Sequence, residues 1–441
     1  MIAFYAVSNL AIFNALNVKE QYYPDTGADL FVRYVNGTMV ELVEWVRNTG
    51  VFDNVFTINF PVISTKAEGL GRVKLLRALS QGIKYQRFVS RYLNTMVPGK
   101  KYDVLLTLHM DSHCVYFADY FHRNNKKLSI EFFEDGTASY LRSRKFIALR
   151  PIRMQLGFKA YIAKCFYQMP IRIRLRSVIS RVLYIYAPEQ YDLKKGFRPK
   201  KLEIGKTGRE ILTQIADAID PTLRMRYEKR PIYYIANAKS RGEPTYDDAY
   251  KILDCIIESV GRDKLIIKTH SSASTENKLG FASQFEKVAY VDRNVYLLEG
   301  LLSGITDIEN KVIIARATTA MILPKLWFNK EPYIILTLRL FPYYGQYGDP
   351  GGDEYIEMLR SMYSDPSRIM VPNTLGDLRI MLMQLRMRVY NERYGTLESV
   401  VLEDAMPEWE EMKTQIMEEQ AALEPPAVTE DHSKRNRRAA K

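Results

Sequence analysis

Short apolar runs and longer stretches with helical spacing alternate along this chain, and the alternation occurs twice. In the first half the apolar runs are IAFYAV, VFTINFPV, YDVLLTLHM and KLSIEFFED. Between them, MVELVEWVRN and VKLLRALSQGIKYQRFVSRYL place apolar residues three and four positions apart. Strands that alternate with helices indicate a parallel sheet with crossover helices.

The second series begins at RPIYYIANAK. Its further predicted strands are KLIIKTH, KVIIARA and EPYIILTL, and its predicted helices are DDAYKILDCIIESVG, NVYLLEGLLSGI and TTAMILPKLWF. Each series is typical of a doubly wound unit. We therefore predict an α/β chain of GT-B-like architecture, in which two Rossmann-like domains face a central cleft.

Changes in composition suggest the domain boundaries. We expect an N-terminal domain over residues 1–190, with a basic joining region from about residue 141, and a C-terminal domain over residues 191–402. Residues 403–441 hold an acidic helical segment and then a polar tail with several basic residues. Such a tail has too little apolar surface to fold, so we expect it to be disordered.

The composition narrows the class of protein. The chain has 441 residues, of which 47% are hydrophobic and 26% charged, as in ordinary globular proteins with two or three domains. Its three cysteines, Cys114, Cys165 and Cys255, form no CxxC pair. This argues against a disulfide framework or a structural zinc site and favours a reducing cytoplasm. No window reaches the roughly 18 uninterrupted apolar residues of a membrane-spanning helix.

The charge is distributed unevenly. The net charge is +12, and the stretch from Gly136 to Pro188 contains no Asp or Glu. Its basic residues alternate with aliphatic and aromatic ones; they are Arg142, Arg144, Lys145, Arg150, Arg153, Lys159, Lys164, Arg172, Arg174, Arg176 and Arg181. We interpret 142–181 as a contact for an anionic lipid or glycan surface. A solvated basic face is one alternative; nucleic-acid binding is another, although no recognised pattern for it is present.

Reactive side chains follow several predicted strands, and ligands of open α/β sheets bind beyond these carboxyl ends. Glu134, Asp135 and Gly136 directly follow the run LSIEFF. A carboxylate there is a candidate general base, and a glycine lets a substrate or another backbone approach closely. An ordinary Asp-Gly turn is the alternative.

His270 ends the predicted strand KLIIKTH, with Lys268 two residues before it and Ser271 directly after it. An imidazole in this position suits phosphate binding or proton donation. A surface histidine in a turn is the alternative.

Thr318 and Thr319 follow the predicted strand KVIIARA and open a predicted helix. A helix N-terminus with hydroxyl groups suits an anion, although N-capping alone explains threonines there. Glu299 lies among leucines at the start of another predicted helix. It is a candidate for hydrogen bonds to ribose hydroxyls, or simply an exposed helix residue. The motifs GxxxxGK[ST], GxGxxG, DxD and HExxH are absent, so a DxD-type metal site is not expected.

Taken in chain order, EDG at 134–136, KTH at 268–270, LLE at 297–299 and TTA at 318–320 resemble the motif series of bacterial GT-B-fold sialyltransferases. These include lipooligosaccharide sialyltransferases and capsular polysialyltransferases. Their first domain carries a D/E-D-G motif, and their second carries a His-Pro motif and then a Ser/Thr pair. EDG matches fully, Ser271 stands where the proline is usual, and two threonines stand where two serines are common.

The resemblance implies an inverting, metal-independent glycosyltransferase without a cofactor. It would move sialic acid, or a related ulosonic acid, from a CMP-activated donor to a hydroxyl of lipooligosaccharide or capsular polysaccharide. The first domain would take the acceptor and the second the nucleotide donor. Asp135 would be the general base, Glu134 would tune its pKa, and His270 would stabilise or protonate the leaving phosphate. The residues expected to bind the donor are Gly136, Lys268, Ser271, Glu299, Thr318 and Thr319.

We expect such an enzyme in the bacterial cytoplasm, attached peripherally to the inner membrane through 142–181, with no specific nucleic-acid partner. One alternative is a transferase that uses another CMP or CDP donor, such as Kdo or glycerol phosphate. A further alternative is a non-enzymatic basic scaffold of the capsule machinery.

Overall fold

The computed structural model describes residues 1–33, 38–58, 72–111, 113–137, 139–140, 168, 170–192, 196–236, 246–261, 264–269, 290–292, 298–340 and 351–394. The chain divides into two compact units, Met1–Asn373 and Thr374–Lys441, and the second contains α13 (Leu375–Tyr394). His270, Ser271, the basic residues 142–164 and the segment 403–441 lie outside the described residues, and the predictions made for them stay predictions. None of the described helices is long and apolar enough to cross a membrane.

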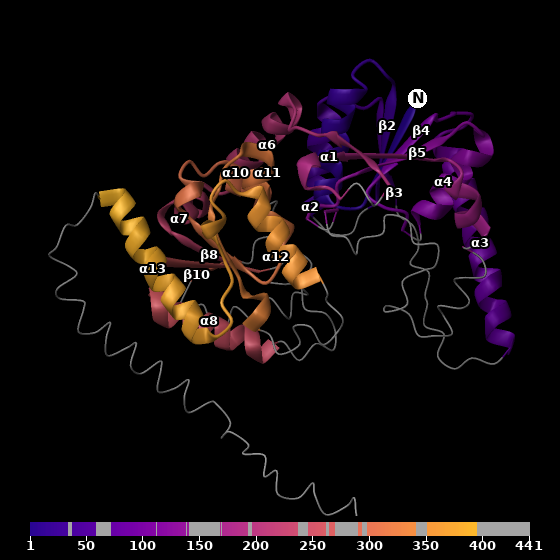
Figure 1. Cartoon of the computed structure of the whole chain (residues 1–441). Coiled ribbons are helices and arrows are strands. Elements are labelled where there is room, and N and C mark those ends of the chain that lie inside the picture. Colours follow the sequence, from indigo (N-terminus) through magenta and orange to yellow (C-terminus); the bar gives the residue numbers. More distant parts are fainter. Residues whose placement is uncertain are drawn as a thin grey trace, which may run out of the picture. The chain divides into compact units, whose positions relative to one another are not determined.

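Seven parallel strands form the first sheet, in the order β3-β2-β1-β4-β5-β6-β7 (Figure 1). They are β1 (Ile2–Ala6), β2 (Ala28–Arg33), β3 (Asn54–Ile58), β4 (Val104–Thr107), β5 (Ser129–Phe133), β6 (Ile179–Ile185) and β7 (Arg198–Lys201). Their connecting helices include α1 (Asn9–Tyr22), α2 (Thr38–Asn48), α3 (Arg72–Met96) and α4 (Cys114–Asn124). This is the strand order of a Rossmann fold, in which the winding reverses between β1 and β4.

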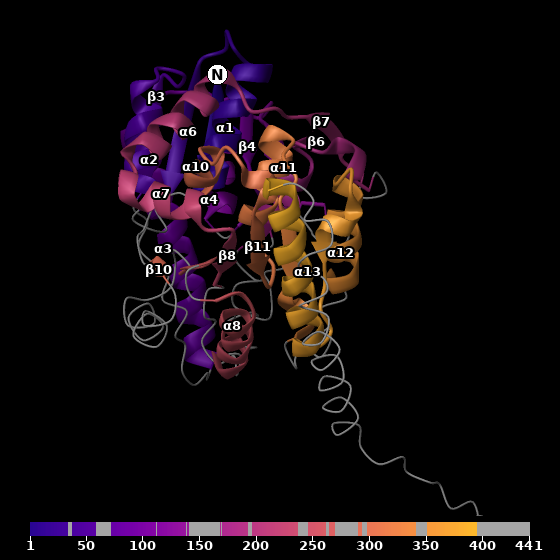
Figure 2. The same ribbon diagram turned by 90° about the vertical axis from the view of Figure 1, so that its left-hand side faces the viewer.

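Helices cover both faces of this sheet. In Figure 1 its strands lie between α1 and α2 on one side and α3 and α4 on the other. Every residue of β1 is buried, as expected for a parallel strand covered on both faces. Tyr5 and Phe31 are register neighbours, and both pack on Phe117 of α4, with ring centroids 5.2 and 4.9 Å apart. On the other face α1 contacts α2 and α6 (Lys206–Ala218), as Figure 2 shows.

Six parallel strands form the second sheet, in the order β10-β9-β8-β11-β12-β13. They are β8 (Ile232–Ile235), β9 (Leu265–Lys268), β10 (Tyr290–Asp292), β11 (Val312–Ala315), β12 (Tyr333–Leu336) and β13 (Ile369–Met370). Helices α7 (Pro221–Lys229), α8 (Tyr246–Val260), α10 (Leu298–Ser303), α11 (Leu323–Phe328) and α12 (Gly351–Met362) accompany them. The order repeats that of the first sheet. The chain therefore contains two Rossmann-type domains, the composition of a GT-B fold, and the predicted fold class is confirmed.

Some strands were not expected from the sequence. The first sheet extends past residue 190, because β7 pairs with Val182–Ile185 of β6. β2 escaped attention because Asp29 interrupts its apolar run. Asp29 is fully buried, and it accepts hydrogen bonds from the Lys100 ammonium at 2.6 Å and the Tyr102 hydroxyl at 2.5 Å. Partners about 70 residues away therefore make this carboxylate compatible with a sheet interior.

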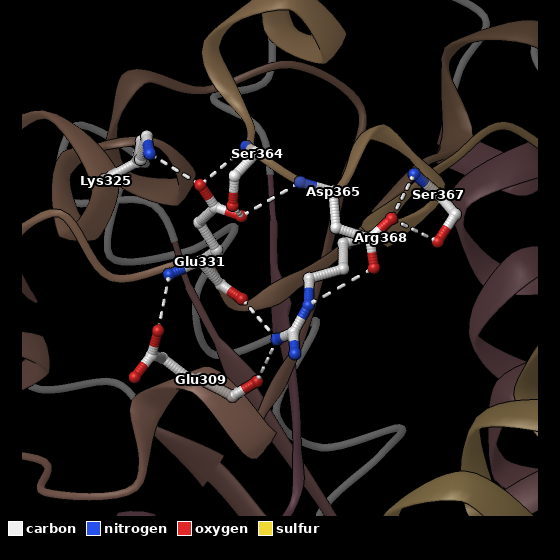
Figure 3. A network of polar contacts seen from close by, with 7 residues as sticks. All are labelled: Glu309, Lys325, Glu331, Ser364, Asp365, Ser367 and Arg368. Carbon is white, nitrogen blue, oxygen red and sulfur yellow. Dashed lines mark hydrogen bonds and ion pairs between the residues drawn. The ribbon is translucent and has the colours of Figure 1, made fainter.

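A polar network around Glu331 fixes the edge of the second sheet (Figure 3). The carboxylate accepts hydrogen bonds from the Lys325 ammonium at 2.5 Å and from the N–H and hydroxyl of Ser364 at 2.8 and 2.7 Å. Arg368 donates to the carbonyl oxygens of Glu331 and Glu309 at 2.6 and 2.9 Å. Burial raises the pKa of Glu331, but the hydrogen bonds outweigh it and lower the pKa to about 2. The network thus ties the start of β12 to the start of β13.

Candidate functional site

The EDG segment forms a tight turn at the carboxyl edge of the first sheet, directly after β5. Gly136 has a φ of 56°, a left-handed conformation that glycine adopts without steric cost. The hydroxyl of Ser139 accepts a hydrogen bond from the N–H of Asp135 at 2.6 Å, and the N–H of Ser139 donates to the Gly136 carbonyl at 3.0 Å. These hydrogen bonds fix the backbone of the turn and therefore the position of the Asp135 α-carbon.

Gly136 lies directly against Thr319. A β-carbon added to Gly136 would stand 2.3 Å from the Thr319 hydroxyl oxygen and 2.4 Å from its methyl carbon, so only glycine fits without a shift. Thr319 follows β11 of the second sheet, and Gly136 follows β5 of the first. Two motifs that the sequence presents about 180 residues apart, EDG and TTA, are therefore in contact.

The helix predicted over TTAMILPKLWF is wrong in its form, because two short elements replace it. Thr319–Met321 form a 3-10 turn, and α11 begins only at Leu323. Pro324 lies in the first turn of α11, and without an N–H it cannot continue an α-helix from Thr319. Thr318 is extended, and its side chain makes no capping hydrogen bond. The macrodipole of a long helix therefore does not act at this pair.

His109, which was not among the predicted site residues, lies beside Asp135. Its Nδ1 is 3.7 Å from Oδ2 of Asp135, and both side chains are partly exposed. The two residues follow β4 and β5, which are neighbours in the sheet. The signal was available, because YDVLLTLHM places a histidine after a strand just as KLIIKTH does.

An ion pair between Asp111 and Arg33 continues the polar edge towards β2. Oδ2 of Asp111 lies 3.5 Å from the guanidinium of Arg33, the last residue of β2. Oδ1 of Asp111 accepts hydrogen bonds from the N–H groups of His113 and Cys114 at 2.7 and 2.6 Å, which caps the start of α4. The polar edge thus runs from β5 through β4 to β2, at the carboxyl ends where ligands of such sheets bind.

Glu134 points into the protein rather than towards this edge. Its side chain is fully buried, and Oε2 accepts hydrogen bonds from the Tyr140 hydroxyl at 2.5 Å and the Tyr186 N–H at 2.9 Å. Among the described atoms Oε1 has no hydrogen-bond partner. Burial outweighs these hydrogen bonds and, with a smaller contribution from the Asp135 charge, raises the pKa of Glu134 to about 8. Glu134 therefore keeps its proton at neutral pH and holds the turn as a neutral group.

Buried asparagines tie the turn to α1. Nδ2 of Asn14 donates to the Glu134 carbonyl at 2.7 Å, and its Oδ1 accepts from the Tyr186 hydroxyl at 2.8 Å. Nδ2 of Asn17 donates to the same hydroxyl at 2.8 Å. A buried network with these bonds satisfied specifies one arrangement of its backbone. Asn14 and Asn17 are thus positioning residues, and their signal was the interruption of an apolar N-terminal stretch.

On the predicted donor side, the described backbone includes Lys268 and Glu299. Lys268 ends β9, is buried, and accepts at its carbonyl a hydrogen bond from the Ala236 N–H at 2.9 Å. Glu299 is the second residue of α10, and its side chain is not among the described ones. With His270 and Ser271 also outside the described part, donor binding by these residues stays a prediction. Within that part, no three His, Cys, Asp or Glu side chains form a group able to hold a metal ion.

A cavity of about 660 Å³ adjoins the turn at Tyr140. Its charged lining residues are all acidic: Glu189, Asp192, Glu354 and Glu357. Carboxylates accept hydrogen bonds, so this lining suits hydroxyl groups better than anionic ones. The volume is in the range of small-molecule sites.

Comparisons with known proteins show a likeness of structure only. No protein-family model matches the sequence, and no curated protein matches it. A Listeria monocytogenes protein described as a UDP-N-acetylglucosamine 2-epimerase is 12% identical, with a TM-score of 0.47 and coverage of 88% of this chain and 89% of that one. The UDP-GlcNAc 2-epimerase of Methanocaldococcus jannaschii is 13% identical, with a TM-score of 0.45 and coverage of 88% and 92%.

A UDP-glucosyltransferase of Polygonum tinctorium is 10% identical, with a TM-score of 0.45 and coverage of 95% of this chain and 98% of that one. These TM-scores lie below 0.5. The assignment of two Rossmann-type domains therefore rests on the strand orders of the two sheets.

Proposed function

We propose that this chain is a glycosyltransferase that moves sialic acid, or a related ulosonic acid, from a CMP-activated donor to a hydroxyl of a cell-surface glycan. The observation that carries the proposal is the contact between Gly136 and Thr319. It joins a turn bearing a carboxylate from one domain to a hydroxyl pair from the other. In an enzyme whose two domains each bind one substrate, such a contact brings the acceptor and the nucleotide-bound sugar together.

In the proposed reaction Asp135 takes the proton of the acceptor hydroxyl while the oxygen of that hydroxyl attacks the anomeric carbon of the sugar. The bond from that carbon to the phosphate oxygen breaks, the configuration inverts, and CMP leaves as an anion. Nδ1 of His109 lies 3.7 Å from this carboxylate, beside the place of proton transfer. The motif resemblance assigns stabilisation of the leaving phosphate to His270, Thr318 and Thr319, and it implies that no metal ion takes part.

The cavity beside the turn supports this proposal as a place for the acceptor. The acidic cavity at Tyr140 offers carboxylates as acceptors for sugar hydroxyls. Glu134 positions the turn from the interior side, through Tyr140 and Tyr186. We therefore assign Glu134 the role of a positioning residue, in place of the expected role of tuning the pKa of Asp135.

Nucleotide release from several donors tests the proposal. The full chain is incubated with CMP-sialic acid, CMP-Kdo or CDP-glycerol, each with and without lipooligosaccharide or a neutral oligosaccharide acceptor. We expect CMP release from CMP-sialic acid, stimulated by an acceptor. Nucleotide release from CDP-glycerol alone would assign CDP-glycerol as the donor in place of CMP-sialic acid. Nucleotide release from none of the three donors would overturn the proposal.

Replacement of the candidate base gives a second test. Asp135→Asn should lower the acceptor-dependent rate by about 10²-fold or more, the scale of a positioned base. The matched control Asp25→Asn changes an exposed carboxylate distant in sequence and should leave the rate unchanged. Near wild-type turnover by Asp135→Asn would refute the assigned role.

A further inference from the structure

One face of α3 is packed inside the protein and the other is not. Tyr85, Val89 and Leu93 follow one another at four-residue spacing, and all three are buried. Residues with this spacing lie on one side of a helix. The opposite side of α3 therefore faces outward.

The outward side combines exposed apolar and basic side chains. Ile83 is 49% exposed and Phe88 is 38% exposed, and Lys84, Arg87 and Arg91 are exposed with them. We call these five residues the α3 face. Exposed large apolar side chains grouped with cations need an explanation, because a solvated helix normally carries polar residues there.

The charge of this part of the molecule is positive. Among the 25 residues of α3, six are Lys or Arg, and none is Asp or Glu. An acidic residue that contacts α3 is Asp119 of α4, whose fully buried carboxylate accepts a hydrogen bond from Gln86 at 2.8 Å and pairs with Arg123 at 3.2 Å. Arg174 pairs with the same carboxylate, so the negative charge of Asp119 is already compensated.

The same carboxylate joins a third helical segment to α3. Residues 170–176 are helical, and Arg174 connects them to α4 through Asp119. Ile173, next to Arg174, is 56% exposed. Of the five exposed large hydrophobic residues in the described part of the chain, three thus lie on α3 and this segment. Ile173 next to Arg174 thus repeats the combination of an exposed apolar and a basic side chain found on the α3 face.

We propose that the α3 face docks onto a bilayer rich in anionic lipid. Basic side chains are attracted to the anionic headgroups, and the apolar ones insert at the headgroup boundary. A soluble polyanion or a nucleic acid would use the cations alone and leave Ile83 and Phe88 in water. The exposed apolar side chains are therefore the reason for choosing a bilayer. This extends the contact expected over 142–181 to a surface defined by described side chains.

Vesicle sedimentation with the full chain tests the docking. The vesicles contain phosphatidylcholine alone or with 30% phosphatidylglycerol, at low and high salt. The wild type should bind only the anionic vesicles, and high salt should weaken the binding. The charge variant Lys84→Glu/Arg87→Glu/Arg91→Glu should bind about 10²-fold more weakly, from roughly tenfold or less per basic residue. Its matched control reverses three exposed cations elsewhere, Lys206, Arg209 and Lys229, and should bind as the wild type does.

A second variant separates a bilayer from a polyanion. Ile83→Ser/Phe88→Ser keeps every charge, and its control is Met225→Ser, an exposed methionine of α7. The double variant should lose about tenfold or more in vesicle affinity, whereas the control should lose none. Equal binding by the double variant, or equal loss by the control charge variant, would overturn the proposal. The proposal would also be overturned if the wild type bound RNA as strongly as it binds anionic vesicles and the double variant bound RNA equally well. Nucleotide release with soluble acceptors should not change in either variant, so this test fails or succeeds independently of the proposed activity.

Discussion

Substitution of Glu134 by Gln should change the pH dependence of stability. The carboxyl is fully buried, and its Oε2 accepts two hydrogen bonds while its Oε1 has no partner among the described atoms. Glutamine keeps one acceptor oxygen for Tyr140 and Tyr186 and resembles the protonated acid in size and charge. It removes the ability to ionise and replaces the O–H of the acid with an NH2 group, whose cost does not depend on pH.

The magnitude follows from the pKa. The pKa of Glu134 rises from 4.5 to about 8 in the fold, mainly because burial disfavours the carboxylate. A group with a raised pKa in the folded state stabilises most fully below its unfolded pKa and loses that contribution as pH rises to its folded pKa. Linkage then gives a loss of about 2.5 kcal/mol between pH 5 and pH 7, and of about 4 kcal/mol by pH 9. The Gln variant lacks this loss.

The free energy of unfolding from urea titrations at pH 5, 7 and 9 measures the effect. The difference between the Gln variant and the wild type should shift in favour of the variant by these amounts as pH rises. A matched control is Glu44→Gln, which changes a carboxylate whose side chain is 55% exposed and should give no such trend. Acceptor-dependent turnover should survive in Glu134→Gln and fall in Glu134→Ala, because only the second breaks both hydrogen bonds.

Parallel pH curves for the wild type and Glu134→Gln would refute the reasoning. They would mean that Glu134 ionises in the folded protein much as it does in the unfolded chain. Loss of turnover in Glu134→Gln at unchanged stability would refute the positioning role in a different way. It would show that the acidic proton itself is needed.

Two further predictions concern the contact between the domains and the edge of the second sheet. Gly136→Ala should lower turnover by about 10²-fold, because its β-carbon would displace Thr319. The control Gly50→Ala, at a φ of 69° with nothing within 4 Å, should cost only about 1–2 kcal/mol of stability from left-handed strain; equal turnover losses in both variants would contradict this prediction. Glu331→Gln should lower the free energy of unfolding by about 3 kcal/mol at pH 7, since the pKa of Glu331 is lowered from 4.5 to about 2 in the fold. The wild type loses this stabilisation as pH falls from about 4.5 to about 2, so urea titrations in that range that show no convergence of variant and wild type would contradict the prediction.

Much of the fold was readable from local patterns. The runs IAFYAV, KLSIEFFED and KVIIARA became β1, β5 and β11, because buried parallel strands must be almost wholly apolar. The β10 and β13 strands were not readable, since they have only three and two residues and lack a run of sufficient length. The form of the TTA segment was also misjudged, because Pro324 divides it.

The sequence by itself determined the class of fold and the positions of EDG and TTA at strand ends, because apolar periodicity and glycine placement are local properties. Only the tertiary structure decided that Gly136 meets Thr319, that His109 lies beside Asp135, and that Glu134 faces Tyr186. These contacts join residues from different strands or domains. Their geometry depends on strand order and on packing, which no local pattern records. The burial that raises the pKa of Glu134 belongs to the same category, since solvent is excluded by parts of the chain remote in sequence.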